Sequence, residues 1–437
     1  MSTILQISSL LKVGFGAAGV DIIRQGLQKS QTQAQTSLVL NSRGSLVKCI
    51  FLFCDIRQFT DTTECLLEEI FVFTNKVASV VHPICSAYGG SANKNVGDAF
   101  LMSWLLEERE VKSESVNRDE SRSFKPRSRS RLRFSSLMEL FYKKNVDTSL
   151  RTDADRALLA VVKILCALYH DNFILESLSD DAQNRLLEFF ADRPGPLVQL
   201  GFGLHIGEAV VGAIGSQRKI DATYLSVNVD FSEFLESSTK TYGVRMLMSH
   251  EFHNCLNPNN KRRCRQVDRV CTDFEENEED FEAAAALSVT ELYTLDLDIE
   301  ALWKVPKNSS EEVPTSPTSA DGNANENEDE NATTTAPTPK RKVPKLEIPT
   351  GFVTYKESDW QTEDMVEMRR KYVEFPFLDW YSRGLTAFYN KNWAIASRQF
   401  LKILNQFEDG PSRYFMKKIE ANNGVPPKKF YGFNTDV

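Results

Sequence analysis

Two aspartates border apolar runs of the chain, and their carboxylates could hold a divalent cation. Asp55 ends the apolar run 46–54, and Asp98 follows a glycine and directly precedes the apolar run 99–104. Carboxylate oxygens are the ligands that hard cations such as Mg²⁺ prefer in proteins. Taken singly, Asp55 is explained as a helix cap and Asp98 as a turn residue. Taken together, the two acids would form a cation site if their strands were neighbours.

The segments around the two acids predict how they are positioned. The length and β-rich composition of residues 46–55 predict a buried strand that ends on an acid. Residues 62–81 have helical periodicity, and residues 89–104 resemble two extended pieces around a tight Gly-Asp turn. The order strand, helix, hairpin predicts an α+β domain with both acids at the ends of adjacent strands.

An insertion interrupts this domain. Residues 107–145 hold few apolar residues before 132 and include the basic run 125–133, which favours a solvated loop over a segment that binds an anionic partner or a kinase. The pattern then resumes with a helix, a strand, a helix and a strand over residues 154–187, 197–206, 231–240 and 244–248.

Three further regions flank the domain. Residues 1–45 predict a lead-in of short amphipathic helices, and residues 305–347, rich in Ser, Thr, Pro, Asn and Glu, predict a disordered linker because they cannot form a core. Residues 350–437 are aromatic and helical, and Trp380 and Trp393 have the spacing of one tetratricopeptide-like helix pair. A single repeat rarely stands alone, so we expect these helices to dock on another part of the protein.

Composition limits the function classes. Lys plus Arg number 52 against 60 Asp plus Glu, a net charge of −8, so no global basic field favours nucleic acid as a partner. The eight scattered cysteines are typical of buried thiols in a reducing compartment. Because no run of about 18 apolar residues and no leader pattern occurs, we expect no transmembrane segment. A cytoplasmic location is expected, with any membrane association made through a partner.

The motifs around both acids resemble those of a known enzyme family. Residues 53–60 read Phe-Cys-Asp-Ile-Arg-Gln-Phe-Thr and residues 94–98 read Lys-Asn-Val-Gly-Asp. They resemble the two metal motifs of class III nucleotidyl cyclase catalytic domains of the microbial-eukaryote adenylate type. Residues 203–216 look like the glycine-rich strand of that family, and residues 219–223 like its purine-contacting segment. The resemblance covers residues 46–297 and implies a ferredoxin-like α+β fold with a central antiparallel sheet and flanking helices.

The resemblance implies a specific activity and site. The chain would be an adenylate cyclase, a phosphorus–oxygen lyase that converts ATP to 3′,5′-cyclic AMP and pyrophosphate at a dimer interface, in cyclic-nucleotide signalling. Asp55 and Asp98 would be catalytic and, with the Ile56 carbonyl, would hold two Mg²⁺ or Mn²⁺ ions. The implied nucleotide-binding residues are Phe59, Thr60, Lys94, Gly97, Thr223 and Asp230. Lys94 would favour ATP over GTP because a cationic donor matches the unprotonated ring nitrogen of adenine.

The sequence departs from the family pattern at three positions. A gapless alignment places Asp230 and Phe234 where the family has the Asn and Arg that contact ribose and phosphate. An alignment shifted onto Asn228 restores the Asn but puts Ser232 at the Arg position. The expected phosphate-contacting Lys is replaced by the acidic stretch 271–280. These losses predict a weak homodimer and a competent heterodimer with another cyclase domain; the alternative is a catalytically degenerate, regulatory cyclase-like protein.

Overall fold

The computed structural model describes residues 44–108, 148–170, 174–191, 198–216, 219–271, 289–299, 301, 349–374, 376–427, 430 and 432–434. Most of the predicted lead-in, all but two residues of the predicted insertion and the whole predicted linker lie outside these residues.

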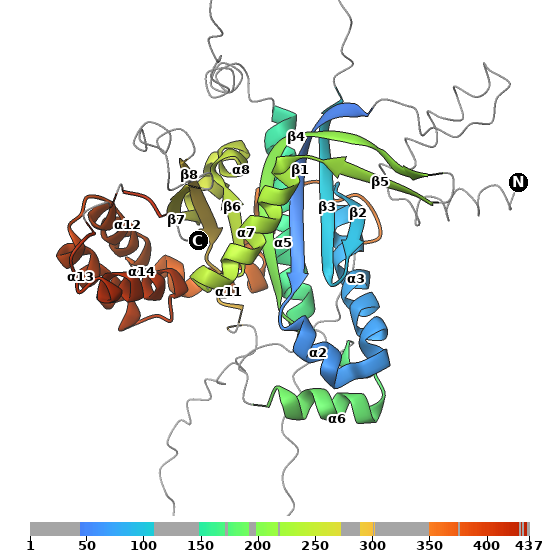
Figure 1. Ribbon diagram of the computed structural model, residues 1–437, viewed down its shortest axis with the longest axis horizontal. Coiled ribbons are helices and arrows are strands. Elements are labelled where there is room, and N and C mark those ends of the chain that lie inside the picture. Colours follow the sequence, from blue (N-terminus) through green and yellow to red (C-terminus); the bar gives the residue numbers. More distant parts are fainter. Residues whose placement is uncertain are drawn as a thin grey trace, which may run out of the picture.

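The described strands form one sheet with the order β2-β3-β1-β4-β6-β8-β7, and β5 pairs with β4 outside this path (Figure 1). β4 and β6 pair in parallel, and every other pair is antiparallel. The strands are β1 (Ser45–Ile56), β2 (Ser91–Val96), β3 (Ala99–Glu108), β4 (Leu200–Ser216), β5 (Lys219–Leu225), β6 (Met246–Ser249), β7 (Cys264–Cys271) and β8 (Val289–Leu295). The sheet and its flanking helices confirm the predicted α+β class, with one parallel pair in a sheet that was expected to be antiparallel.

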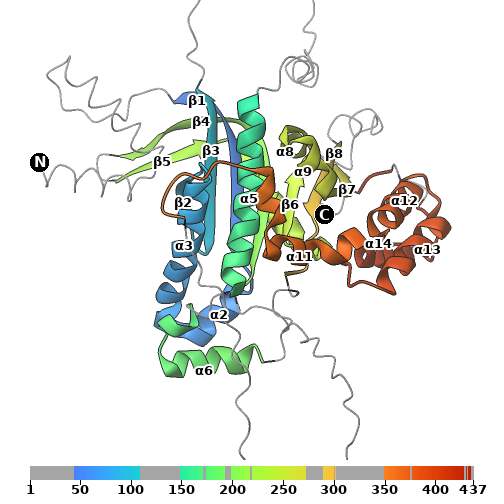
Figure 2. The same ribbon diagram turned by 180° about the vertical axis from the view of Figure 1, so that it is seen from behind.

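β1 is buried on both of its faces, which explains its continuous apolar run. Ile50 and Leu52 point toward α3 and α5 in the main core, whereas Phe51 and Phe53 belong to a smaller cluster on the opposite face. Figure 2 shows α3 and α5 covering one side of the sheet, and Figure 1 shows α7 on the other. A Cβ atom at Gly203 would lie 2.0 Å from the Ser232 carbonyl oxygen, so the glycine allows α7 to approach β4 closely.

The helices follow the strands closely in the chain. In the first part they are α2 (Phe59–Leu66), α3 (Ile70–Ala87), α5 (Thr148–His170), α6 (Asp180–Phe189), α7 (Val227–Tyr242), α8 (His250–Cys255) and α9 (Pro258–Arg263). After them come α11 (Glu363–Glu374), α12 (Phe377–Tyr389), α13 (Trp393–Leu404) and α14 (Gly410–Ala421). Short 3-10 helices lie at Leu67–Glu69, Leu175–Ser177 and Glu357–Gln361.

One helical stretch within the described residues, Phe59–Ala87, is apolar and long enough by composition to cross a membrane. A 3-10 turn divides this stretch into α2 and α3. Phe73, Val77 and Val81 of α3 are buried in the main core. Core helices of folded domains can be as long and as apolar as a membrane-spanning helix. The absence of a transmembrane segment therefore remains a prediction.

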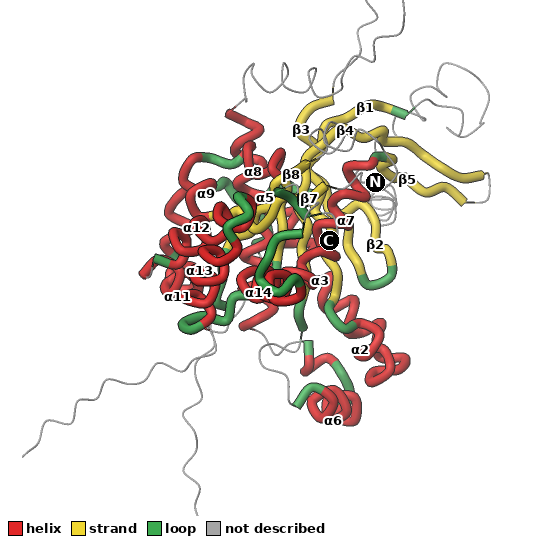
Figure 3. Tube along the Cα trace, turned by 60° about the vertical axis from the view of Figure 1, so that its left-hand side comes forward, coloured by secondary structure: helices red, strands yellow, loops and turns green. Residues whose placement is uncertain are grey.

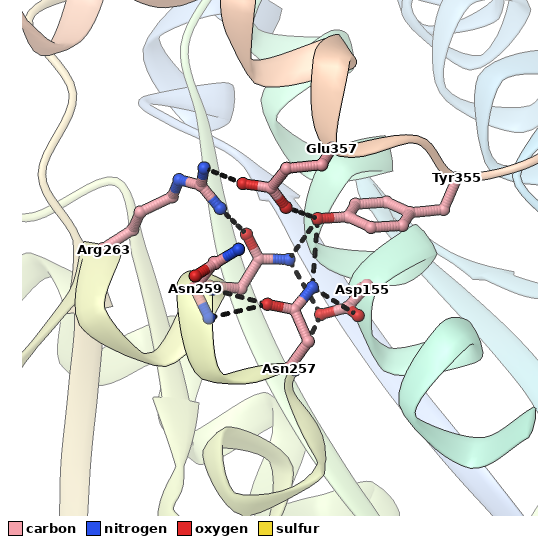
Figure 4. Close-up of polar contacts among 7 residues, drawn as sticks. Asp155, Asn257, Asn259, Arg263, Tyr355 and Glu357 are labelled. Atoms are coloured by element: carbon pink, nitrogen blue, oxygen red, sulfur yellow. Dashed lines mark hydrogen bonds and ion pairs between the residues drawn. The ribbon is translucent and has the colours of Figure 1, made fainter. Parts of the chain in front are cut away.

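The residues that precede α11 pack against α5 and the start of α9. Figure 4 shows Asp155 of α5 accepting a hydrogen bond from the side-chain amide of Asn257, which is 2.8 Å long. The side-chain amide of Asn260 donates to the same carboxylate, also at 2.8 Å. The Tyr355 hydroxyl accepts from both amides at 3.1 Å and donates to Glu357 at 2.9 Å. This network ties residues 355–357 to helices far earlier in the chain (Figure 4).

Helices α12, α13 and α14 build a second apolar cluster around Phe388, Trp393 and Phe400. Figure 3 shows them grouped beside the sheet edge that ends in β7. The Tyr381 hydroxyl of α12 donates to the Val267 carbonyl of β7 at 2.8 Å. The helices therefore dock on the sheet, and their tetratricopeptide-like character stays a prediction.

Candidate functional site

The hairpin β2-β3 and strand β1 bring Asp55 and Asp98 together. β1 and β3 pair antiparallel with Asp55 opposite Ala99, so Asp98 comes one residue before the partner of Asp55. Gly97 occupies the turn with φ +65°, a conformation that favours glycine. The side chains of the two aspartates lie within hydrogen-bonding distance of each other. The structure thus joins the two acids that were picked out in the sequence.

The electrostatics of the pair favour a bound cation. Burial, followed by the charge of Asp55, raises the pKa of Asp98 to about 6. Two neighbouring carboxylates therefore resist ionising together, and a divalent cation would relieve their repulsion. The oxygen donors fit Mg²⁺ or Mn²⁺, and the Ile56 carbonyl follows directly in the chain. Among the described residues no cluster of three or more His, Cys, Asp or Glu side chains suits a metal, so the pair would hold cations with main-chain and substrate oxygens.

Helix α7 adds three polar groups to the site. Lys240 Nζ lies 3.4 Å from Asp55 Oδ2. Glu236 forms an ion pair with Arg57, with 3.2 Å between Arg57 Nη1 and Glu236 Oε1. Arg57 also donates a hydrogen bond to the Thr239 hydroxyl. Burial raises the pKa of Glu236 and lowers the pKa of Arg57, while the charge of each partner opposes these shifts.

The space for the Arg57–Glu236 pair exists because residue 201 is a glycine. Gly201 lies opposite Asp55 in the pairing of β1 and β4, so it shares the face of the sheet that α7 covers. A Cβ atom at Gly201 would lie 2.1 Å from Glu236 Oε1 and 2.2 Å from Arg57 Nη2.

Sequence analysis missed Arg57, Glu236 and Lys240 as members of one cluster. Arg57 follows the first metal motif directly, but its partners lie about 180 residues later in the chain. The available signal was Leu235-Glu236, which the gapless alignment matches to a Leu-Glu pair that ends the family motif; it aligned the helix without showing its contacts.

The N-terminus of α2 lies next to Asp55 in the chain. Gln58, which precedes the helix, has φ 54° and provides no side-chain cap. Phe59 is half-buried and Thr60 is exposed in the first turn. The first N–H groups of a helix carry a partial positive charge and suit an anion.

Lys94 lies on β2 and is paired with Asp221 of β5. Lys94 Nζ is 2.7 Å from Asp221 Oδ2, and both side chains are partly exposed. Thr223, the residue chosen from the sequence, is two positions further along β5 and opposite Gly212. Residues two apart share a face of a strand, so Thr223 lies on the same side as Asp221. The sequence motif contained Asp221 but gave no reason to prefer it to Thr223.

The start of α7 lies away from the carboxylate pair. Asp230 is exposed in the first turn, ten residues before Lys240, which is about 15 Å along a helix. Phe234 stacks on Phe231 with ring centroids 5.5 Å apart and packs on an apolar cluster. Within a single copy of the chain, Asp230 therefore does not reach the site formed by Asp55 and Asp98.

Asn228, the residue of the shifted alignment, already has partners within the chain. Its side-chain oxygen lies 2.9 Å from His205 Nε2, and its side-chain nitrogen donates to the Glu208 carbonyl at 2.8 Å.

Comparison with known proteins finds cyclases, at low sequence identity. No family model matches the chain. Over 200 residues it is 24% identical to an adenylate cyclase of Anabaena cylindrica, a match that covers 45% of this chain and 28% of that enzyme. The chain thus spans about a quarter of the length of this curated relative.

Similar solved structures are also cyclases. A bacterial light-regulated adenylyl cyclase is 19% identical with a TM-score of 0.42, covering 68% of this chain and 61% of that one. An adenylyl cyclase of P. aeruginosa is 16% identical with a TM-score of 0.35, and the match covers 58% of this chain and 96% of that one. The guanylate cyclase domain of a Catenaria anguillulae protein, solved with GTP, is 13% identical with a TM-score of 0.31. That match covers 57% of this chain and 97% of the other. These are members of the family that the two metal motifs resemble, and with TM-scores below 0.5 the functional assignment depends on the residues of the site.

Proposed function

We propose that this protein is a divergent class III nucleotidyl cyclase that converts ATP to 3′,5′-cyclic AMP and pyrophosphate. The observation that carries the proposal is the pair Asp55 and Asp98 at adjacent strand ends, with the pKa of Asp98 raised to about 6. Asp55, Asp98 and the Ile56 carbonyl would hold two Mg²⁺ or Mn²⁺ ions, which supply Lewis-acid activation and charge stabilisation when bound.

The reaction needs an attacking hydroxyl and a leaving group. The ribose 3′-oxygen bonds to the α-phosphorus, the bond from that phosphorus to the bridging oxygen breaks, and pyrophosphate leaves. The 3′-hydroxyl loses its proton to solvent or to a phosphate oxygen. Uncapped N–H groups at the start of α2, from Phe59 and Thr60, would bind phosphate oxygens next to the carboxylate pair.

Base recognition would fall to Lys94 and Asp221, with Thr223 beside them. The Lys94 ammonium would donate to the unprotonated ring nitrogen of adenine, and the Asp221 carboxylate would accept from its amino group. Guanine presents a ring N–H and a carbonyl oxygen at these two positions, which reverses donor and acceptor. The 2.7 Å pair between Lys94 and Asp221 supports a preference for ATP.

A complete site would form between two cyclase domains. Asp230 lies about 15 Å from Lys240 along α7, so its contribution to ribose binding would be made to the site of a partner. Several exposed apolar side chains lie on β2, β4, β5 and the start of α7, a surface that a second domain would cover: Val96, Val210, Ile214, Leu225 and Val227. Either a homodimer or a heterodimer would bury it.

A second candidate function is that of a regulatory, catalytically silent half of a heterodimer. It is favoured by Phe234, which packs on an apolar cluster where the family has an arginine. Losing one transition-state donor typically lowers kcat by a factor of about 10²–10³.

For either function we place the protein in the cytoplasm, attached to a membrane only through a partner. We regard its C-terminal helices as a tetratricopeptide-like docking unit.

The test is product formation by the purified chain with Mn²⁺ and either ATP or GTP, at several protein concentrations. Cyclic AMP and pyrophosphate in equal amounts, with a rate that rises more than linearly with protein concentration, would support a homodimeric adenylate cyclase. Nucleotide binding without product would support the regulatory function. Cyclic GMP as the main product would contradict the assigned roles of Lys94 and Asp221.

A further inference from the structure

Lys240 is the charged side chain least fixed in position beside the carboxylate pair. It lies in the last turn of α7, and its side chain is 56% exposed, whereas that of Asp55 is 18% exposed. A lysine ammonium on a flexible four-carbon stem can move several ångströms without moving its helix.

Arg57, the other cation of the cluster, is held in place. It is 12% exposed, pairs with the buried Glu236 and donates to Thr239. Removing Arg57 from Glu236 would leave a buried carboxylate without its partner, which is costly. Arg57 therefore neutralises Glu236, and of these two described cations Lys240 is the one that a ligand could engage.

A divalent cation on Asp55 and Asp98 would change the partner of Lys240. The cation would repel the ammonium, whose nitrogen lies 3.4 Å from Asp55 Oδ2, and would attract the phosphate oxygens of a nucleotide to the same edge of the sheet. An ammonium displaced from Asp55 would then have a negatively charged group within its reach.

We infer that Lys240 is a phosphate-binding residue with two partners: it pairs with Asp55 before a divalent cation binds, and it contacts the substrate triphosphate afterwards. This inference rests on the proposed function. The family's phosphate-contacting lysine is missing from this chain, because the acidic stretch 271–280 stands in its place. Lys240 would supply a phosphate contact from the same chain that carries the carboxylate pair.

The experiment compares Lys240→Gln with Lys240→Arg and with Lys402→Gln, an exposed lysine near the end of α13. Mn²⁺ binding is measured by electron paramagnetic resonance without nucleotide, and binding of a non-hydrolysable ATP analogue is measured by calorimetry with Mn²⁺ present. Lys240→Gln removes the competitor of Mn²⁺, so we expect Mn²⁺ to bind about two- to fivefold more tightly. It also removes a charge-assisted contact, so the ATP analogue should bind about tenfold more weakly. Lys240→Arg should retain the affinity for the analogue, and Lys402→Gln should match the wild type in both measurements.

The possible outcomes separate the two proposals. Unchanged analogue binding in Lys240→Gln, with normal Mn²⁺ binding in the wild type, would overturn the role of Lys240 alone. Loss of analogue binding in Lys402→Gln as well would also overturn it, because the effect would then come from net charge. Absence of Mn²⁺ binding in the wild type, or its persistence in Asp55→Asn, would overturn the cation site of the proposed function.

Discussion

The carboxyl group of Asp98 combines burial with a neighbouring negative charge, and its pKa is raised to about 6 as a result. A raised carboxyl pKa means that the folded chain holds this proton more tightly than the unfolded chain does. Its contribution to stability is fully present below the unfolded pKa of about 3.8 and is lost as the pH rises through about 6. A divalent cation at the pair reverses the preference, because it binds the ionised form.

Mn²⁺ binding should therefore depend on pH in a defined direction. Below pH 6 each bound Mn²⁺ must displace the proton of Asp98, so the Kd should rise about tenfold per pH unit. Above pH 7 the Kd should be nearly constant. Electron paramagnetic resonance titrations between pH 5 and 8 measure this, and a Kd that does not change between pH 5 and 6 would contradict the assignment.

Gly201→Ala should displace the Arg57–Glu236 pair. The new Cβ atom would overlap both side chains, and Glu236 is only 2% exposed, so a buried carboxylate would lose part of its ion pair. We expect the free energy of unfolding to fall by about 1–3 kcal/mol. Chemical denaturation gives the value.

Gly212→Ala on the same strand is the matched control. A Cβ atom at Gly212 would meet only the Gly44 Cα at 3.5 Å, an ordinary contact, so stability should change little. Equal effects of the two substitutions would show that the ion pair does not depend on Gly201.

Asp55 and Asp98 could be predicted because each is fixed by its immediate neighbours, an apolar strand before Asp55 and a Gly-Asp turn before β3. The partners of Asp55 could not, because Lys240 is 185 residues away and reaches the site only through the packing of α7 on β4. Lys94 was identified from its motif, but its pairing with Asp221 depends on the position of β5.

At the scale of elements, α7 links the carboxylate pair to the C-terminal helices. Its last residue, Tyr242, donates to Asp268 Oδ2 at 2.5 Å, and Asp268 also accepts from Tyr389 at 2.6 Å and Asn434 at 2.5 Å. Asp268 is completely buried, and this desolvation raises its pKa despite these three donors and a fourth, the Arg269 backbone N–H at 2.7 Å. The end of α7 is therefore fixed by one buried carboxylate.

Tyr242→Phe should weaken this connection. The substitution removes one donor from a buried acceptor that water cannot reach, so the free energy of unfolding should fall by about 1–3 kcal/mol. Tyr293→Phe is the control, because the Tyr293 hydroxyl donates to Glu291, a carboxylate that is 27% exposed and that water can solvate. Urea denaturation of both variants tests the difference, and a smaller loss for Tyr242→Phe than for Tyr293→Phe would contradict it.

Strand composition was enough to predict β1, helical periodicity predicted α7, and the tight Gly-Asp turn predicted the hairpin β2-β3. The parallel pairing of β4 with β6 was not predicted, since it depends on where α7 places the next strand. Residues 350–374 were expected to belong to a separate helical region, yet Trp360 before α11 and Met365 and Met368 within it are buried in the main core. Their apolar side chains gave no indication of which core they would join.

At the scale of the whole molecule, a buried arginine holds the C-terminal helices against the sheet. Arg265 of β7 pairs with Asp296, which follows β8, at 2.6 Å and with Asp409, the N-cap of α14, at 2.8 Å. Its guanidinium also lies 4.1 Å from the ring centroid of Tyr381. All three charged side chains are less than a tenth exposed.

Arg265→Gln should destabilise the whole chain rather than the C-terminal helices alone. It leaves two buried carboxylates without their shared cation, which typically costs about 3–5 kcal/mol. Differential scanning calorimetry should show a single transition at a lower Tm. A variant that unfolds in two steps, with the first step limited to the C-terminal helices, would contradict the prediction.

The most direct test of the central claim is the yield of cyclic AMP and pyrophosphate from Mn²⁺-ATP in the wild type, in Asp98→Asn and in Asp181→Asn. Asp181 is an exposed aspartate on α6 that serves as the matched control. The cation site predicts a loss of about 100-fold or more in Asp98→Asn, with folding unchanged, and wild-type rates in Asp181→Asn. Cyclic AMP formed at equal rates by the wild type and Asp98→Asn would contradict the assignment of Asp55 and Asp98 as the catalytic pair.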